Sequence, residues 1–244
     1  MSDDCRLTAD TLFAGHLVCK QYDQGYRFSI DAVLAAHFCR PQSGAHVLDL
    51  GCGSGVISLI LAYRHPGLQV TGLEIQPELV SLARDNINAN SMTERASVIE
   101  GDLRNIKEYF PPESFDIVVS NPPYRDPGSG RVSPTDQRAR ARHEIDAVLT
   151  DIVAAVAYAV KNRGRVVFVY PAPRAMPLIH SLKTLRLEPK RFQPVYSYPG
   201  GDDACLVLVE AVKNGGEGVR VLAPFYLYTG KKGPYTAQMQ ELYN

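Results

Sequence analysis

The chain has 244 residues, which is enough for one sizeable domain with small additions. Its 26 basic residues balance its 26 acidic residues, so net charge neither indicates nor excludes a nucleic-acid partner, and any basic surface must be local. No apolar run approaches the ~18 residues of a membrane span, and the acidic start MSDDCRLTAD lacks the apolar core of a signal peptide, so we expect no membrane partner.

The chain divides into three expected segments. Residues 1–45 are less regular than the rest, and RFSIDAVLAAHFC predicts one short helix there with Ser29 as its N-cap. Residues 46–212 alternate between strand-like and helix-like stretches and form the main domain. Residues 213–244 follow the flexible stretch KNGGEGV and form a tyrosine-rich tail of unknown role, with a turn between Gly230 and Gly233.

Strict alternation of strand and helix predicts an α/β fold with a mostly parallel sheet and helices on both faces. The last two strands have no helix between them, so we expect them to pair antiparallel as a terminal pair of a seven-stranded sheet. The expected strands are residues 46–50, 68–74, 96–102, 115–121, 165–171, 190–199 and 203–212. The expected helices in this part are residues 55–65, 76–90, 144–160 and 174–187.

The five cysteines are scattered without a CxxC pair, and the six histidines show no HxxxH or similar spacing. Zinc sites typically use such close pairs, and scattered cysteines give no sign of a disulfide framework. The sequence therefore predicts reduced thiols in a cytoplasmic protein with no bound metal.

A glycine-rich loop, VLDLGCGSGVISL, lies between the first strand of the main domain and the helix after it. Gly51, Gly53 and Gly55 allow backbone N–H groups to approach a ligand closely, at the sheet edge where α/β proteins bind ligands. Glu74 ends the next strand, where a carboxylate can accept both hydroxyls of a ribose.

Two cofactors fit this outline, but the loop reads GxGxG rather than the GxGxxG of a dinucleotide site. Asp49, at the strand end, suits a cationic cofactor better than a pyrophosphate, which favours S-adenosylmethionine with its sulfonium and ammonium groups. Asp102 follows the third strand and is placed to accept from the adenine amine of that cofactor. The alternative for Asp102 is that it only caps the following helix.

The fourth strand ends in SNPPY, residues 120–124, at the same edge as the glycine loop. The nitrogen of an exocyclic amine is planar and a poor nucleophile, because its lone pair is delocalised. Two acceptors, the Asn121 side-chain oxygen and the rigidly directed Pro122 carbonyl, would favour pyramidal geometry and localise that lone pair. Tyr124 offers a flat face on which a base can stack. The alternative is that SNPPY is only a tight turn leaving a strand.

The motifs YRFSIDAVLAAHF, VLDLGCGSGVISLILA, GLEIQPELVSLARDNINAN and SNPPYRDPGSGRVSP together resemble the bacterial tRNA1(Val) adenine-37 N6-methyltransferases. These are Rossmann-like class I methyltransferases with an NPPY motif. The resemblance runs from about Tyr26 to about Glu210 and implies methylation of an adenine beside a tRNA anticodon. It implies cofactor binding by Asp49, Gly51, Gly53, Gly55, Glu74, Ile75, Asp102, Leu103 and Asn121. It implies that the base is held by the catalytic residues Asn121, Pro122, Pro123 and Tyr124.

Other substrates remain open at the level of the sequence. NPPY also occurs in enzymes that methylate a glutamine amide of release factors or a guanine amine of ribosomal RNA, and both nitrogens are planar too. The tRNA interpretation is favoured because an N-terminal helical domain typical of the release-factor enzymes is absent and a basic segment follows NPPY. A non-enzymatic module that binds S-adenosylmethionine or RNA is the remaining alternative.

The basic segment, residues 125–143, leaves directly from the NPPY corner and is rich in glycine, proline and arginine. We expect it to act as a mobile lid that grips RNA phosphates, and the alternative is a solvated surface loop. Its expected RNA-binding residues are Arg125, Arg131, Arg138, Arg140 and Arg142.

Overall fold

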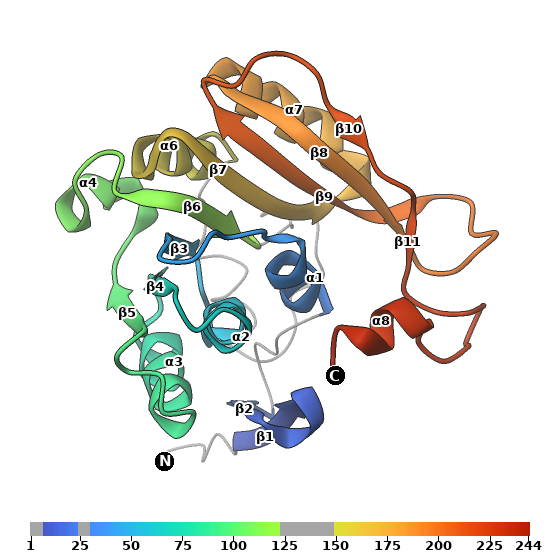
Figure 1. Ribbon diagram of the computed structural model, residues 1–244, viewed down its shortest axis with the longest axis horizontal. Helices are drawn as coiled ribbons and strands as arrows, with labels where there is room; N and C mark the ends of the chain where they lie inside the picture. The colour runs from blue at the N-terminus through green and yellow to red at the C-terminus, as the bar shows by residue number, and fades with distance from the viewer. Residues whose placement is uncertain (1–6, 24–29, 123–148) are drawn as a thin grey trace, which may run out of the picture.

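A computed structural model describes residues 7–23, 30–122 and 149–244. Its main sheet confirms the expected α/β fold (Figure 1), with the strand order β10-β8-β9-β7-β6-β3-β4-β5 and with β11 also paired to β8. The seven long strands are β3 (His46–Leu50), β4 (Gln69–Glu74), β5 (Ala96–Glu100), β6 (Phe115–Ser120), β7 (Val160–Pro171), β8 (Leu187–Tyr196) and β9 (Ala204–Lys213).

Strand β9 is the reversed strand of the sheet. It pairs antiparallel with β8, as the sequence predicts, and antiparallel with β7 on its other side. The pairs β3–β4, β3–β6, β4–β5 and β6–β7 are all parallel. The carboxyl ends of β3, β4, β5 and β6 therefore meet at one edge, which is where ligands bind in open α/β sheets.

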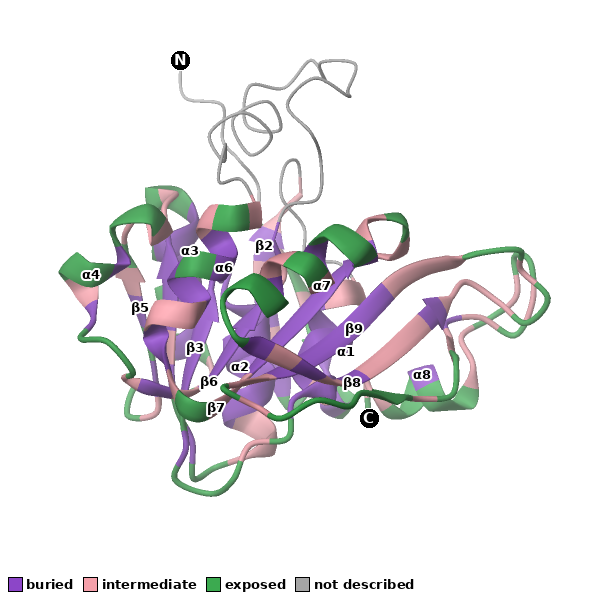
Figure 2. Ribbon diagram, turned by 90° about the horizontal axis from the view of Figure 1, so that it is seen from above, coloured by how far each residue is buried: buried purple, intermediate pink, exposed green. Residues whose placement is uncertain are grey.

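Helices cover both faces of this sheet, and Figure 2 shows the strands buried between them. One face carries α1 (Ile30–Phe38), α2 (Val56–Arg64) and α3 (Pro77–Ala89), and the other carries α4 (Ile106–Tyr109), α6 (Leu149–Ala159) and α7 (Ala175–Thr184). Side chains of β6 alternate between the two cores, with Ile117 and Val119 in one and Val118 in the other. This alternation follows from the two-residue period of a strand.

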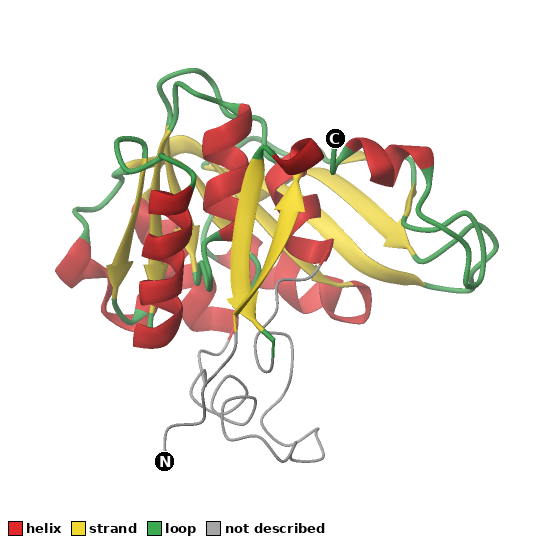
Figure 3. Cartoon of the chain, turned by 90° about the horizontal axis from the view of Figure 1, so that it is seen from below, coloured by secondary structure: helices red, strands yellow, loops and turns green. Residues whose placement is uncertain are grey.

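The N-terminal segment contains an antiparallel hairpin that the sequence reasoning did not predict. Its strands are β1 (Leu7–Leu12) and β2 (Leu17–Tyr22), joined by the short 3-10 helix η1 (Phe13–Gly15), and Figure 3 shows the hairpin as a separate ribbon beside the helices. Two asparagines of α3 hold β2 by its backbone. Asn86 Oδ1 accepts from Lys20 N at 2.8 Å, and Asn90 Oδ1 accepts from Val18 N at 2.9 Å. The expected helix of this segment is α1, whereas its expected cap Ser29 lies outside the described residues.

The tail packs onto the domain. Two short strands, β10 (Arg220–Val221) and β11 (Phe225–Tyr226), pair in parallel with β8, so the sheet has more strands than the seven expected. The helix α8 (Ala237–Glu241) places Met239 in the same core as the hairpin. Phe13 N donates to Tyr243 O at 2.7 Å, which joins the hairpin to the end of the chain. The predicted turn forms, since Gly233 N donates to Gly230 O at 2.9 Å.

Several boundaries differ from the sequence prediction by a few residues, and the start of β7 is the clearest case. Strand β7 begins at Val160 rather than at Arg165, because Val160 pairs with Phe115 of β6 before the register shifts. Helix α6 therefore ends at Ala159, and the expected helical residues 144–148 lie outside the described part of the chain. In residues 7–23, 30–122 and 149–244, no helix combines the length and the apolar character that crossing a membrane requires.

Candidate active site

The glycine loop turns sharply as it leaves β3. Gly51 N and Cys52 N both donate to Leu73 O of β4, at 2.8 and 3.1 Å, so the start of the loop is fixed to the neighbouring strand. Gly51, Gly53 and Gly55 have φ angles of 74°, 56° and 82°, a region that side chains with a Cβ rarely adopt. A Cβ on Gly51 would meet no atom within 4 Å, so the backbone there faces open space that a ligand can occupy.

Glu74 organises the same loop from the end of β4. Its Oε2 accepts from Gly53 N at 2.9 Å, and its Oε1 accepts from Gln76 N at 3.0 Å. The side chain is buried, and burial raises the pKa of Glu74, although the hydrogen bonds from Gln76 and Gly53 oppose that shift. The carboxylate therefore lies against the loop, and its role toward a ribose stays a prediction.

Asp49 is fully buried behind the loop. Its Oδ2 accepts from the backbone N of Ser58 at 3.1 Å and from Ser58 Oγ at 2.8 Å. Its Oδ1 has no hydrogen-bond partner among the described residues. Burial raises the pKa of Asp49 to about 7, and the nearby Glu74 carboxylate adds to the rise. A buried oxygen without a partner is costly, so this site favours a cation or a donor beside Asp49.

The corner after β6 is tied to the end of β3. Ser120 Oγ donates to Leu50 O at 2.9 Å, and both residues are buried. Asn121, half-buried, and Pro122, buried, follow at once, so they leave the sheet beside the glycine loop. Ser120 was not predicted as part of the site, although its position in SNPPY, one residue before Asn121, is a signal for such an anchor.

Asn86 is a second residue that the sequence reasoning missed. Its side chain is fully buried, and its Nδ2 donates to Ser54 O of the glycine loop and to Lys20 O of the hairpin, both at 3.0 Å. One amide thus links α3, the hairpin and the loop. The signal in the sequence was the pair of asparagines one helical turn apart in RDNINAN, which lie on one face of a helix.

Asp102 lies near Glu74, because Gly101 N donates to Glu74 O at 2.8 Å. Its Oδ1 accepts from Arg104 N at 2.9 Å, which caps the 3-10 helix η2 (Leu103–Asn105). Arg104 Nε donates to Asp102 Oδ2 at 2.8 Å, and this bond lowers the pKa of Asp102. The capping alternative for Asp102 is therefore present in the structure, and a role toward adenine stays a prediction.

The remaining predicted residues divide between those near the loop and those outside the described chain. Ile75 follows Glu74 and Leu103 follows Asp102, and both are half-buried. Pro123, Tyr124, Arg125, Arg131, Arg138, Arg140 and Arg142 lie outside the described residues. Within the described ranges, no group of three or more His, Cys, Asp or Glu side chains could hold a metal ion.

The side chains around the glycine loop fit S-adenosylmethionine better than a dinucleotide. Buried carboxylates at Asp49 and Glu74 favour cationic and hydroxyl groups, and they disfavour the phosphates of a dinucleotide. The open space at Gly51 lets the ligand approach the backbone.

The chain matches the family described as methyltransferase small domain over residues 19–177. It is 33% identical over 156 residues to a tRNA1(Val) (adenine(37)-N6)-methyltransferase of Porphyromonas gingivalis, covering 63% of this chain but only 60% of that protein. It is 30% identical over 183 residues to the protein of the same name from Vibrio parahaemolyticus, covering 71% of this chain and 74% of the relative.

Solved structures agree on the fold. A predicted O-methyltransferase from Agrobacterium tumefaciens superposes with a TM-score of 0.72 at 21% identity, covering 88% of this chain and 95% of that one. A geranyl diphosphate methyltransferase in complex with SAM superposes with a TM-score of 0.54 at 13% identity, covering 75% of this chain and 84% of the other. Because the match to the methyltransferase small domain spans residues 19–177, well over half of the chain, the chain belongs to that family.

Proposed function

We propose that this chain is an S-adenosylmethionine-dependent N-methyltransferase that acts on the exocyclic amine of adenine in RNA, at adenine-37 of valine tRNA. The observation that supports the proposal is the bond from Ser120 Oγ to Leu50 O, which ties the residue before Asn121 to the residue before the glycine loop. The relatives that carry this activity in their names support the choice of tRNA as substrate.

In this proposal Asp49, Gly51, Gly53 and Glu74 hold the cofactor, which supplies a methyl group already activated by its sulfonium charge. The Asn121 side-chain oxygen and the Pro122 carbonyl accept from the two N–H groups of the adenine amine, which orients the nitrogen and localises its lone pair. Because the methyl group is already activated, no strong general base is needed. The main task of the chain is to align the two reactants, which can lower a barrier by ~7–11 kcal/mol.

The same proposal assigns base stacking to Tyr124 and places the reaction in the cytoplasm. Cys19, Cys39, Cys52 and Cys205 are free thiols in the described structure, which suits a reducing compartment. The segments 1–45, 46–212 and 213–244 then serve one active site, and the packing of Met239 with the hairpin supports a shared fold for all three.

The test uses the purified chain, S-adenosylmethionine and three substrates in parallel: unmodified valine tRNA, a ribosomal RNA fragment and a peptide-chain release factor. We expect N6-methyladenosine in the tRNA digest by mass spectrometry, and none when position 37 carries guanosine. Methyl transfer to the glutamine amide of the release factor, or to the amine of guanine, would show instead that the site acts on one of these nitrogens. Loss of the same nucleoside from bulk tRNA of a deletion strain would give the result in cells.

A further inference from the structure

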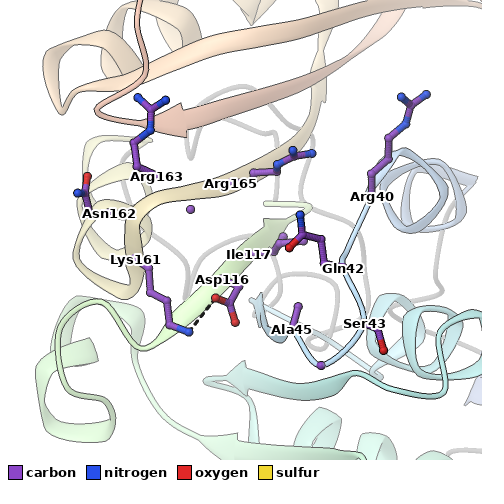
Figure 4. A pocket seen from close by; sticks show the side chains of 12 residues that line it. Arg40, Gln42, Ser43, Ala45, Asp116, Ile117, Lys161, Asn162, Arg163 and Arg165 are labelled. Atoms are coloured by element: carbon purple, nitrogen blue, oxygen red, sulfur yellow. Dashed lines mark hydrogen bonds and ion pairs between the residues drawn. The ribbon is translucent and has the colours of Figure 1, made fainter.

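A cavity of about 360 Å³ (Figure 4) lies at the amino ends of β3 and β6, whereas the glycine loop follows the carboxyl end of β3. It is lined by the residues before β3, by the start of β6 and by the first part of β7. At ~3.3 Å per residue, the run of β6 from Asp116 to Asn121 places this cavity roughly 17 Å from the candidate active site. A cavity of this size is within the range that holds small ligands, about 300–1,000 Å³.

Four basic side chains line the cavity, and one acidic side chain joins them. The basic residues are Arg40, Lys161, Arg163 and Arg165, and the acidic residue is Asp116. Two polar residues of the loop before β3, Gln42 and Ser43, add an amide and a hydroxyl. Since the whole chain has no net charge, this excess of positive charge is local.

The ion pairs of the described residues leave part of that charge unbalanced. Lys161 Nζ is neutralised by Asp116 Oδ1 at 2.7 Å, and Asp116 Oδ2 also accepts from His46 N at 2.9 Å. Burial raises the pKa of Asp116, but the hydrogen bonds from Lys161 and His46 outweigh burial and hold this pKa below its usual value. Asp116 therefore stays charged and paired with Lys161.

The arginines are less well matched. Arg165 Nη1 lies 3.8 Å from Glu210 Oε2, but the same oxygen accepts from the buried Arg191 at 3.0 Å. Arg163 Nη1 donates to a neutral acceptor, Asn214 O, at 2.8 Å. Arg40 is exposed and forms no ion pair with any described residue. Figure 4 shows Arg165 extending toward the side on which Gln42 and Arg40 lie.

We propose that this cavity, referred to here as the basic pocket, binds a phosphate group. Guanidinium groups present planar pairs of donors that match phosphate oxygens, and the pocket supplies them from separate segments of the chain. The phosphate can come from a free nucleotide or from the backbone of an RNA that reaches around the sheet. The second source rests on the proposed function, whereas the first is independent of it.

The test removes one guanidinium group from the segment before β3 and one from β7, in the variant Arg40→Gln/Arg165→Gln. Arg40→Gln alone serves as a milder variant, because Arg40 is exposed and contributes nothing to the core. Arg40→Lys/Arg165→Lys keeps the charge and removes the planar donors. The matched control is Lys183→Gln/Arg220→Gln, which loses the same charge from exposed positions outside the pocket.

The first measurement is calorimetry with inorganic phosphate and with cytidine 5′-monophosphate, after the cofactor site is saturated with S-adenosylhomocysteine. We expect wild-type binding, a loss of about tenfold or more in the double glutamine variant, and a partial loss in the lysine variant. The second measurement is tRNA binding over a range of salt concentrations, in which two lost phosphate contacts should reduce the log–log slope by ~1.4–1.8.

Lost mononucleotide binding with an unchanged tRNA slope would assign the pocket to free phosphate compounds. A reduced slope in the pocket variants, and not in the control, would assign it to RNA phosphates. Absence of phosphate binding by the wild-type chain together with equal slopes in all variants would overturn the proposal. If the phosphate-binding proposal fails, the amount of N6-methyladenosine formed in the tRNA is unaffected, so this failure is distinguishable from failure of the proposed function.

Discussion

The side-chain amide of Asn86 donates a hydrogen bond to Ser54 O at 3.0 Å, which ties helix α3 to the glycine loop. The same side chain accepts from Lys20 N and donates to Lys20 O, so the hairpin and the loop share one anchor. The geometry of the cofactor loop therefore depends on a residue that need not touch the cofactor.

We expect Asn86→Ala to lower the free energy of unfolding by several kcal/mol, since each buried polar group left unpaired costs about 1–3 kcal/mol. It should also weaken cofactor binding, because the loop loses its support. Urea unfolding and calorimetry with S-adenosylmethionine measure the two effects. Asn90→Ala is the control, because Asn90 holds β2 through Val18 and makes no bond to the loop. Equal cofactor affinity in both variants would contradict a link between Asn86 and the loop.

Asn121→Ala should reduce the rate of methyl transfer by ~10²–10³, the usual cost of removing one aligned polar contact from a transition state. Cofactor affinity should stay within a few-fold of wild type, because the side-chain oxygen acts on the acceptor amine. Single-turnover kinetics with tRNA gives the rate, and calorimetry gives the affinity. Asn121→Asp keeps an acceptor oxygen and should retain more activity than the alanine variant. Turnover near the wild-type rate in Asn121→Ala would contradict the proposal that two acceptors orient the amine.

Cofactor binding should tighten as the pH rises from about 5 to about 7, with release of a proton. The reason is that burial raises the pKa of Asp49 to about 7, and a cationic ligand favours its charged form. In the unliganded chain the free energy of unfolding has the opposite pH dependence, because it falls as the pH rises. The protonated form then stabilises the fold, and this contribution is lost as the pH rises through about 7.

Calorimetry in two buffers of different ionisation enthalpy counts the released protons. Asp49→Asn should abolish both the release and the pH dependence. If the same release persists in Asp49→Asn, Glu74 becomes the titrating group, since burial raises its pKa as well.

Gly55→Ala should destabilise the chain more than Gly51→Ala does. Both positions have positive φ, which costs about 1–2 kcal/mol for a residue with a Cβ. A Cβ on Gly55 would in addition lie 3.2 Å from Ala83 Cβ, whereas a Cβ on Gly51 meets nothing within 4 Å. Gly51→Ala should instead impair cofactor binding, because its methyl group fills the space that faces the ligand. Thermal unfolding and calorimetry separate the two effects, and the reverse order of destabilisation would contradict this packing.

The sequence predicts the sheet well where strands are buried on both sides. HVLDL is strand β3 as expected, and Glu74 ends β4, because short segments with apolar residues, bounded by turn signals and alternating with helical patterns, are typical of central parallel strands. The two-residue strands β10 and β11 could not be predicted, since pairing with β8 rather than local pattern makes them strands. Strand β2 buries alternate residues, Leu17, Cys19 and Gln21, but its sequence LVCKQY does not alternate between apolar and polar residues, so this burial could not be predicted.

The candidate site follows the same division. Loop glycines and Glu74 could be placed from sequence, because strand ends of a parallel sheet meet at one edge. The bond between Ser120 and Leu50, and the support from Asn86, depend on register and helix packing across distant parts of the chain. For Asp102, local hydrogen bonding with Arg104 competes with any role toward a ligand, and the sequence pattern is the same in both cases.

The bond from Phe13 N to Tyr243 O has a consequence for synthesis on the ribosome. The turn of the N-terminal hairpin is synthesised roughly 230 residues before Tyr243, whose carbonyl oxygen accepts from its backbone. The core shared by Phe13, Leu17 and Met239 therefore stays incomplete until α8 has been synthesised. A truncated chain that lacks α8 would expose this apolar surface. Chaperones bind such exposed surfaces, and proteases degrade chains that present them.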